Sequence, residues 1–594
     1  MTTSTFDPET PAVDRGWFGH PRQLARLFST EMWERFGFYG MRVLLTLYLT
    51  KHFLFSDTVT TGLYGGFTAL VYLTPLIGGL VADRMLGAKR SVKFGALVMS
   101  VGYFTLCFGG PTAAPNATFD GHTYPVQIVN GYDRPTSTGE EQRYVVMPAG
   151  KLKIHGNADG SIDLQRADGS IARHLVKDGL VSGGIRPAFY TALLVLGLTL
   201  ITVGNGFFKP NISTIVGSLY PAGDTRRDAG FSIFYMGINL GSLFSQLLCP
   251  VLADHVGWWA GFGLAAIGML ASWALIQFDG GRLAGHGDRP EGANPAHDWR
   301  VWAGSLVAVP VVCLLLVNLM DYVKPAAGSG IVGYLISLPI MGKVMFATFT
   351  IAVPGILIWS RKNGSRQEFQ MMCAAMVLVT FNTVFWTLFE QAGSSLTLFA
   401  DRNTDLHVTS GFSMSAGQTQ FFNAIFIVIL APIFSIVWQA LGKRGLEPSI
   451  PVKFGIALCG AGAGFLLLVF GARFAGPDAR VALGWLAGLY FVHSVAELCI
   501  SPVGLSMITK LSIARIVGMM MGVWFLSISV AQYVAGMVAQ VASVQTVGGE
   551  VTNPRLSLET YVGVFTTIGW VAVGIGVLLL IIALPLRRWM HGVR

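Results

Sequence analysis

Four ionisable side chains lie close together in an otherwise apolar stretch near the start of the chain: Glu31, Glu34, Arg35 and Arg42. In a helix, residues three and four apart share one face, so Glu31 would adjoin both Glu34 and Arg35. Burial raises the pKa of a carboxyl group, whereas a neighbouring cation lowers it. The cluster could therefore take up and release a proton as its ion pairs break and form. The alternative is that Glu31 lies at a helix end and reaches toward water.

Three further charged residues, Lys209, Glu390 and Glu497, each stand alone in an apolar segment. Charges inside a membrane are rare, and they usually line a path for a substrate or an ion. Pro210 directly follows Lys209 and would bend a helix around it. Each residue could instead belong to a buried ion pair that serves only folding. Their spread over both parts of the chain, with both signs present, favours a transport path.

The composition indicates that these charges belong to a membrane protein. Of the 594 residues, 52% are hydrophobic and only 12% are Asp, Glu, Lys or Arg, against about 25% charged residues in soluble domains. Apolar blocks of about 20 residues recur, the length that crosses a hydrocarbon core about 30 Å thick. We expect an all-α polytopic membrane protein with spans at 24–51, 58–83, 91–110, 187–217, 229–252, 258–277, 300–320, 330–360, 368–400, 415–441, 453–472, 481–508, 515–540 and 559–586.

Charges in the loops between these spans predict their orientation. Basic residues gather in alternate loops, and the positive-inside rule places such loops in the cytoplasm. Lys51 and Arg402 are expected to be single charges in loops on the other side. No cleavable signal peptide is recognised at the start, so we expect a multi-pass protein with both termini cytoplasmic. The basic residues are Arg84, Lys89, Arg90, Lys93, Arg226, Arg227, Arg361, Lys362, Lys443, Arg444, Arg587 and Arg588.

Two polar segments interrupt the series of spans. Residues 111–186 alternate polar and apolar positions between turn sequences, which predicts a small β-rich extracytoplasmic insertion without indicating its function. Residues 278–299 contain several Gly and Pro and are interpreted as a linker. The expected parts are a cytoplasmic tail (1–23), a six-helix half (24–277) with the insertion, the linker with two extra helices (278–365), a second six-helix half (366–587) and a cytoplasmic tail (588–594).

Other classes of function find little support. The six cysteines occur singly in apolar blocks and the histidines are isolated, so the sequence indicates no disulfide, metal site or catalytic set. An enzyme, a receptor or a channel would give no reason for lone charges of both signs. The net charge of +9 fits the loop bias better than a surface for nucleic acid.

Four motifs resemble those of known transporters. Glu31-x-x-Glu34-Arg35-Phe36, residues 231–243 (FSIFYMGINLGSL) and residues 497–506 (ELCISPVGLS) are similar to signatures of the proton-dependent oligopeptide transporter family. Residues 79–90 (GLVADRMLGAKR) resemble a loop of the wider major facilitator superfamily. The resemblance implies the major facilitator fold, with two six-helix halves and two inserted helices. It also implies a bacterial inner-membrane symporter that imports di- and tripeptides with protons by alternating access, uses no other cofactor and acts as a monomer.

The resemblance further implies roles for single residues. Glu31, Glu34, Arg35 and Lys209 are expected to couple transport to protons, and Arg42 with Glu390 to form an outer gate. Of these, Arg35 and Lys209 would also hold the peptide carboxylate, while Glu497 would take the peptide amino group. The full set implied to bind substrate is Arg35, Tyr39, Tyr72, Lys209, Asn239, Trp386, Asn423, Glu497 and Trp524.

Two positions depart from the family pattern: Phe38 stands where a second tyrosine is usual, and Ala424 follows Asn423 where a proline is usual. Both affect details of substrate contact and leave the class unchanged. A zwitterionic peptide presents an anion and a cation a fixed distance apart, so a cationic wall facing an acidic one would select it. The alternative is a family member that carries nitrate or another small anion or zwitterion. Such a protein would not need Glu497 or the acidic pair.

Overall fold

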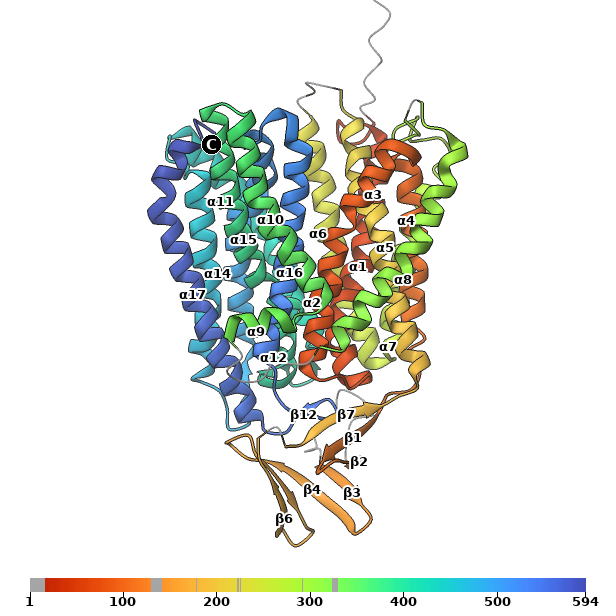
Figure 1. Cartoon of the computed structure of the whole chain (residues 1–594), viewed down its shortest axis with the longest axis vertical. Coiled ribbons are helices and arrows are strands. Elements are labelled where there is room, and N and C mark those ends of the chain that lie inside the picture. Colours follow the sequence, from red (N-terminus) through yellow and green to blue (C-terminus); the bar gives the residue numbers. More distant parts are fainter. Residues whose placement is uncertain are drawn as a thin grey trace, which may run out of the picture.

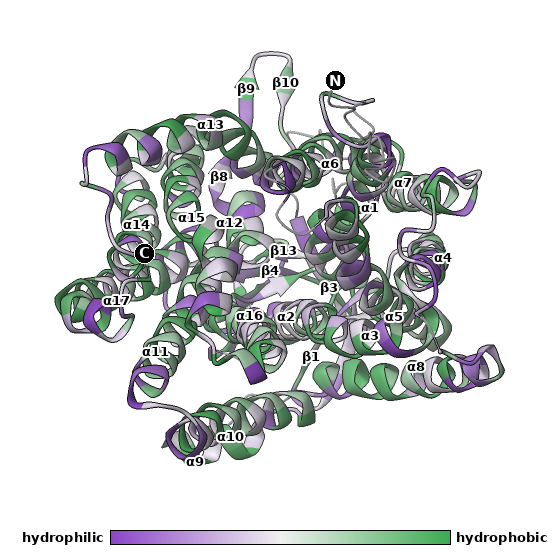
Figure 2. Cartoon of the chain, turned by 90° about the horizontal axis from the view of Figure 1, so that it is seen from above, coloured by the Kyte–Doolittle hydropathy of each residue, from purple (hydrophilic) through white to green (hydrophobic). Residues whose placement is uncertain are grey.

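The chain forms a bundle of long helices with a β-sheet at one end, here called the sheet end (Figure 1). Helix α1 begins, and the described chain ends, at the opposite end. Seen along the bundle, α8 and α13 lie at the periphery and carry mainly apolar residues (Figure 2). This computed structural model describes residues 16–129, 142–177, 179–221, 224, 226–290, 292–322 and 330–593, and only the backbone of Gly330, Ile331, Tyr334, Pro502 and Leu505.

The helices follow the predicted order of two halves with an insertion between them. The first half contains α1 (Arg22–Leu47, continued by a π-helical turn Tyr48–His52), α2 (Asp57–Leu73), α3 (Pro75–Val81, continued by a π-helical turn Ala82–Leu86), α4 (Ala88–Leu106), α5 (Ala188–Ser218), α6 (Arg227–His255) and α7 (Trp258–Gln277). Between the halves lie α8 (Asp298–Met320), α9 (Gly330–Ser337) and α10 (Ile340–Asn363). The second half contains α11 (Arg366–Phe389), α12 (Ser395–Asn403), α13 (Phe421–Lys443), α14 (Ile450–Ala472), α15 (Leu483–Leu511), α16 (Val517–Val541) and α17 (Pro554–Trp589).

Twelve described helical segments are long and apolar enough to cross a membrane. Two predicted spans are helical but do not meet that limit, because α1 carries several buried charges and α4 begins with three basic residues. The all-α prediction is therefore confirmed, and twelve of its fourteen spans are confirmed as apolar ones. One predicted span was wrong in part: 330–360 is broken after Ser337, because Pro339 disfavours a helical conformation at the preceding residue.

The predicted β-rich insertion is confirmed as a seven-stranded antiparallel sheet in the order β6-β5-β4-β3-β2-β1-β7. Its inner face has a small apolar core that includes Ala117, Phe119 and Leu164. The strands are β1 (Ala114–Phe119), β2 (His122–Val129), β3 (Gln142–Met147), β4 (Gly150–Gly156), β5 (Ile162–Gln165), β6 (Ile171–Leu175) and β7 (Val181–Ile185). Short strands elsewhere are β8 (Thr404–Asp405), β9 (His407–Thr409), β10 (Phe412–Ser413), β11 (Val481–Ala482), β12 (Thr546–Val547) and β13 (Glu550–Val551).

This sheet belongs to the first half by chain connection but packs against the second half. The side chain of Val547, in the connection between α16 and α17, is fully buried in the core of the sheet. Gln545 donates a hydrogen bond to the Leu180 carbonyl (2.5 Å), and Ser182 donates one to the Thr546 carbonyl. The sheet therefore bridges the two halves at its end of the bundle (Figure 1).

The halves also contact each other directly at the sheet end, along α2 and α16. A Cβ atom added at Gly65 would lie 2.7 Å from the Cα of Gly536, so glycine is required for this close approach. Ser529 donates a hydrogen bond to the Ala69 carbonyl (2.6 Å). Between described residues, the hydrogen bonds and ion pairs that join the halves occur from this point toward the sheet end. The bundle is thus closed on that side.

At the opposite end, the predicted linker 278–299 packs on the loop before α4. Lys89 pairs with Asp279 (2.7 Å), and the Lys89 backbone N–H donates to the Gly287 carbonyl (2.7 Å). Burial raises the pKa of the Asp279 carboxyl group, but the hydrogen bond and charge of Lys89 outweigh it and hold that pKa below its usual value. This contact fixes the linker against the first half.

We predict that Val547→Asp detaches the sheet from the second half, because it places an unpaired carboxylate in an apolar core. The variant should show faster protease cleavage within residues 111–186 and a lower unfolding temperature. Val181→Asp is the matched control, since Val181 lies on the same sheet and is 65% exposed. Equal cleavage of the two variants would show that Val547 does not hold the sheet.

Candidate functional site

The acidic cluster predicted on the first span is present on α1 and is buried. The Nε atom of Arg35 lies 2.7 Å from Oε1 of Glu31 and 2.8 Å from Oε2 of Glu34. Glu34 is fully buried, and neither of its oxygens accepts a hydrogen bond from a described residue. The Nε–H group of Arg35 therefore lies between two carboxylates. It donates its hydrogen bond to Glu31, and Glu34 is left with an ion pair but without a hydrogen bond. A carboxylate in this position gains by binding a proton.

Lys209 lies on α5 beside this cluster. Its Nζ atom is 3.7 Å from the centre of the Tyr72 ring, a cation–π contact, and it interacts electrostatically with Glu34 and Glu31. Within the described part of the chain, Lys209 forms no ion pair. The structure thus brings a second cation near the carboxylates of α1, where it contacts Tyr72.

Tyr39 and Phe38 occupy different environments on α1. Tyr39 is half-buried and interacts electrostatically with Tyr72, whereas Phe38 is buried with the guanidinium of Arg35 6.0 Å from its ring centre. Phe38, which stands where the family usually has a tyrosine, therefore affects the packing beside Arg35. The Tyr39 hydroxyl group still lies on the side of Tyr72.

Arg42, two turns further along α1, connects the two halves. It forms an ion pair with Glu390 at the end of α11 and donates a hydrogen bond to the Tyr64 hydroxyl group (2.6 Å). All three side chains are buried. Tyr64 was not singled out in the sequence, because a tyrosine in an apolar span carries no charge to mark it.

The candidate acidic wall is formed by α13 and α15 of the second half. Asn423 donates hydrogen bonds to the Ser494 hydroxyl oxygen (2.9 Å) and to Oε2 of Glu497 (3.2 Å). Among the described residues, Glu497 has no cationic partner in an ion pair. Tyr235 on α6 interacts electrostatically with Glu497, so this residue of the motif 231–243 connects the acidic wall to the first half.

Among the described residues, the other predicted substrate-binding residues are not hydrogen-bonded to the charged groups Arg35, Lys209 and Glu497. Asn239 donates to the Tyr235 carbonyl of its own helix (3.0 Å), and the Trp386 indole N–H donates to Asn382 (3.1 Å). Trp524 is buried against Gly504, where a Cβ would lie 2.4 Å from its ring. Asn239 and Trp386 are half-buried and can still meet a ligand.

A fully buried ion pair between the halves was missed by the sequence analysis. Both terminal nitrogens of Arg402 contact the Asp57 carboxylate, at 2.6 and 2.7 Å, and Arg402 also donates to the Tyr561 hydroxyl group (3.2 Å). The expectation that Arg402 is a loop charge was wrong, because Arg402 lies in the last turn of α12 and its side chain is buried. Lys51 pairs nearby with Asp401 (2.6 Å).

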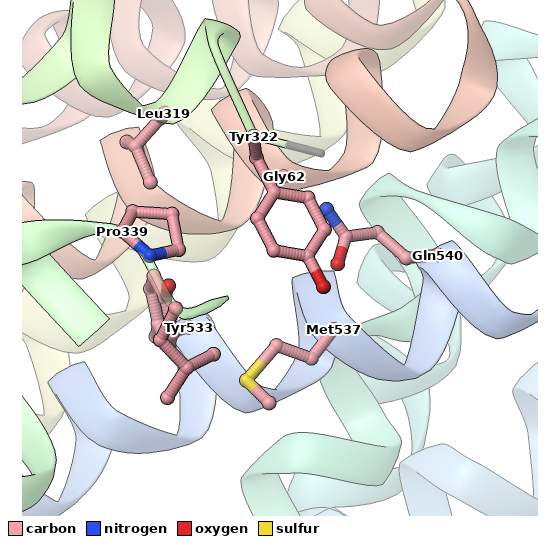
Figure 3. A pocket seen from close by; sticks show the side chains of 8 residues that line it. Gly62, Leu319, Tyr322, Pro339, Tyr533, Met537 and Gln540 are labelled. Carbon is pink, nitrogen blue, oxygen red and sulfur yellow. The ribbon is translucent and has the colours of Figure 1, made fainter. Parts of the chain in front are cut away.

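The described residues contain no group of three His, Cys, Asp or Glu side chains that could hold a metal ion. A small cavity between α2, α8 and α16, lined by Tyr322, Tyr533 and Gln540 among others (Figure 3), has a volume of about 10 Å³. It has room for at most about one water molecule and cannot hold a substrate.

Comparisons with known proteins agree with one another. Residues 170–553 match a family model described as the POT family. The dipeptide and tripeptide permease A of Klebsiella pneumoniae (strain 342) is 30% identical over 99% of this chain and 97% of its own length. The uncharacterized transporter YclF of Bacillus subtilis (strain 168) is 31% identical over 98% and 97%. A crystal structure of the peptide transporter POT in complex with sulfate superposes with a TM-score of 0.72 at 30% identity, covering 98% of each chain.

We predict that removing one partner of the Asp57–Arg402 pair destabilises the protein more than removing both. Asp57→Asn or Arg402→Met should each cost about 3–5 kcal/mol, because the remaining charge is left buried and unpaired. The double variant should recover part of that loss in thermal unfolding of the purified protein. Asp478→Asn is the control, since its ion pair with Arg480 is exposed at 3.8 Å, and it should change stability by less than about 0.5 kcal/mol. A double variant as unstable as the sum of the singles would contradict the pairing argument.

Proposed function

This chain belongs to the POT family of transporters, and on that premise we propose that it is a proton-coupled symporter that imports di- and tripeptides. The observation that supports this most is the bipolar site: Arg35 and Lys209 on the first half, and Glu497 on the second. A peptide zwitterion has one charge for each wall: its carboxylate suits the cationic wall and its ammonium group suits the acidic one. The side chains of the peptide, which vary, would then contact aromatic residues such as Trp386 that can accommodate different shapes.

In the proposed coupling mechanism, Glu34 is the proton acceptor. Protonation of Glu34 removes one of the two carboxylates that share Arg35, so the guanidinium group becomes available to the carboxylate of the peptide. Lys209 assists from α5, where its charge is unpaired. Glu31 retains its hydrogen bond from Arg35 (2.7 Å) and keeps that side chain oriented.

The proposed gate lies at the sheet end, where Arg42 pairs with Glu390. Opening this side would break that pair and the Asp57–Arg402 pair, while the opposite ends of the halves come together. We propose that the sheet end faces the exterior of a bacterial inner membrane and that both termini are cytoplasmic, as the basic loops of the opposite end support. The structure would then be closed toward the outside. We also propose that the transporter acts as a monomer.

The alternative, transport of nitrate or another small anion, is not favoured. An anion needs cations only, and it would leave Glu497 without a partner. The Klebsiella pneumoniae relative of this chain is a dipeptide and tripeptide permease.

The direct test is uptake of labelled dialanine into proteoliposomes with an acid exterior and a negative interior, with and without a protonophore. We expect protonophore-sensitive accumulation. Glu34→Gln should abolish accumulation and keep counterflow exchange, because the variant mimics the protonated side chain and cannot release a proton. Asp478→Asn, a change at an exposed acid, is the control and should transport normally. If Glu34→Gln still concentrated dialanine, Glu34 would not be the coupling residue.

A second prediction concerns the amino group of the peptide. Wild type should prefer dialanine over N-acetyl-dialanine by about tenfold or more in competition, because a buried charge left unpaired costs on the order of 2–5 kcal/mol. In Glu497→Gln this preference should fall to about threefold or less. Asn423→Ala, which removes only the hydrogen-bonding neighbour of Glu497, should retain most of it. An unchanged preference in Glu497→Gln would place the amino group elsewhere.

A further inference from the structure

A groove of about 670 Å³ lies on the outer flank of the second half, between α14 and α17. Both helices stand at the periphery of the bundle (Figure 2). The groove is remote in the fold from the charged cluster of α1 and shares no lining residue with the candidate transport site. The groove is therefore separate from the candidate transport site.

The walls of the groove are apolar over a length that fits a lipid. Leu466 and Phe470 of α14 face Val562 and Trp570 of α17, and the two aromatic side chains are 47% and 62% exposed. Arg555 and Trp570 lie about 22 Å apart along α17 at 1.5 Å per residue. This is close to one leaflet of a bilayer that is about 40–45 Å thick with its headgroups.

Charged residues are confined to the end of the groove nearest the sheet. Arg473 directly follows α14, and Arg555 and Glu559 lie one turn apart at the start of α17. Within the described residues, none of these three side chains takes part in an ion pair. The groove therefore presents two cations and one anion at the level of the headgroups, above apolar walls.

We propose that this groove binds one phosphatidylethanolamine molecule of the leaflet at the sheet end. The two guanidinium groups donate hydrogen bonds to the phosphate, which is the anion their geometry suits best. The primary ammonium group of the headgroup then pairs with Glu559, and an acyl chain lies along the walls toward Trp570. Phosphatidylglycerol offers no cation to Glu559, and the methylated ammonium of phosphatidylcholine has no N–H to donate.

The test is native mass spectrometry of the full-length purified transporter, delipidated and titrated with phosphatidylethanolamine, phosphatidylglycerol or phosphatidylcholine of the same acyl chains. The wild type should bind one phosphatidylethanolamine about tenfold more tightly than either other lipid, because only its primary ammonium group can donate a charge-assisted hydrogen bond to Glu559. Equal affinity for the three lipids, or no bound lipid, would overturn the proposal.

Two sets of variants test the phosphate contact and the ammonium contact of the headgroup separately. Arg473→Ala with Arg555→Ala should weaken phosphatidylethanolamine and phosphatidylglycerol alike by about tenfold. Glu559→Gln should weaken only phosphatidylethanolamine, which removes the preference between them. Arg444→Ala, a change at an exposed arginine at the other end of the bundle, is the control and should leave all affinities unchanged. A preference that survives Glu559→Gln would refute the assignment of the amine, and arginine variants that bind like the control would refute the site.

Discussion

The structure depends on the high free energy of an ionised side chain that is removed from water and left without a partner. On α1, the Nε atom of Arg35 stands between Glu31 and Glu34 and cannot serve both fully. Among the described residues, Oε2 of Glu31 and both carboxylate oxygens of Glu34 accept no hydrogen bond. In the proposed mechanism, this cluster and the nearby Lys209 link proton binding to substrate binding.

The same constraint explains how the halves hold together. Arg42 with Glu390, and Asp57 with Arg402, are buried pairs in which each partner comes from a different half. Such pairs are only tolerable while both partners are in place, because separating them requires water or new partners to reach both charges. Closure at the sheet end is thus stable but reversible. If an apolar contact of equal area joined the halves, opening would not require water to reach buried charges and would depend less on hydration.

The sequence predicted much of this, since hydropathy marks spans and a lone charge within a span is conspicuous. The positions of Glu31, Glu34, Lys209 and Glu497 were found in this way. The Asp57–Arg402 pair could not be found, because its partners are 345 positions apart and each borders a polar loop. Likewise, Tyr64 and Tyr235 differ from other aromatic residues of the spans only in their three-dimensional neighbours, whereas Tyr72 was named from the family resemblance. Alternation in 111–186 predicted strands, whereas the docking of that sheet on Val547 depends on a loop far along the chain.

The docked sheet is a third structural unit of the transporter, beside the two halves. Its two connections join α4 and α5, while its buried contact belongs to the segment between α16 and α17. In the proposed transport cycle the halves separate on this side. An opening that parts the sheet from Val547 would expose the apolar core around Val547 to water only in the state that is open at the sheet end. A binding protein directed to that surface would recognise this state alone and would act as a conformation-selective inhibitor that never enters the membrane.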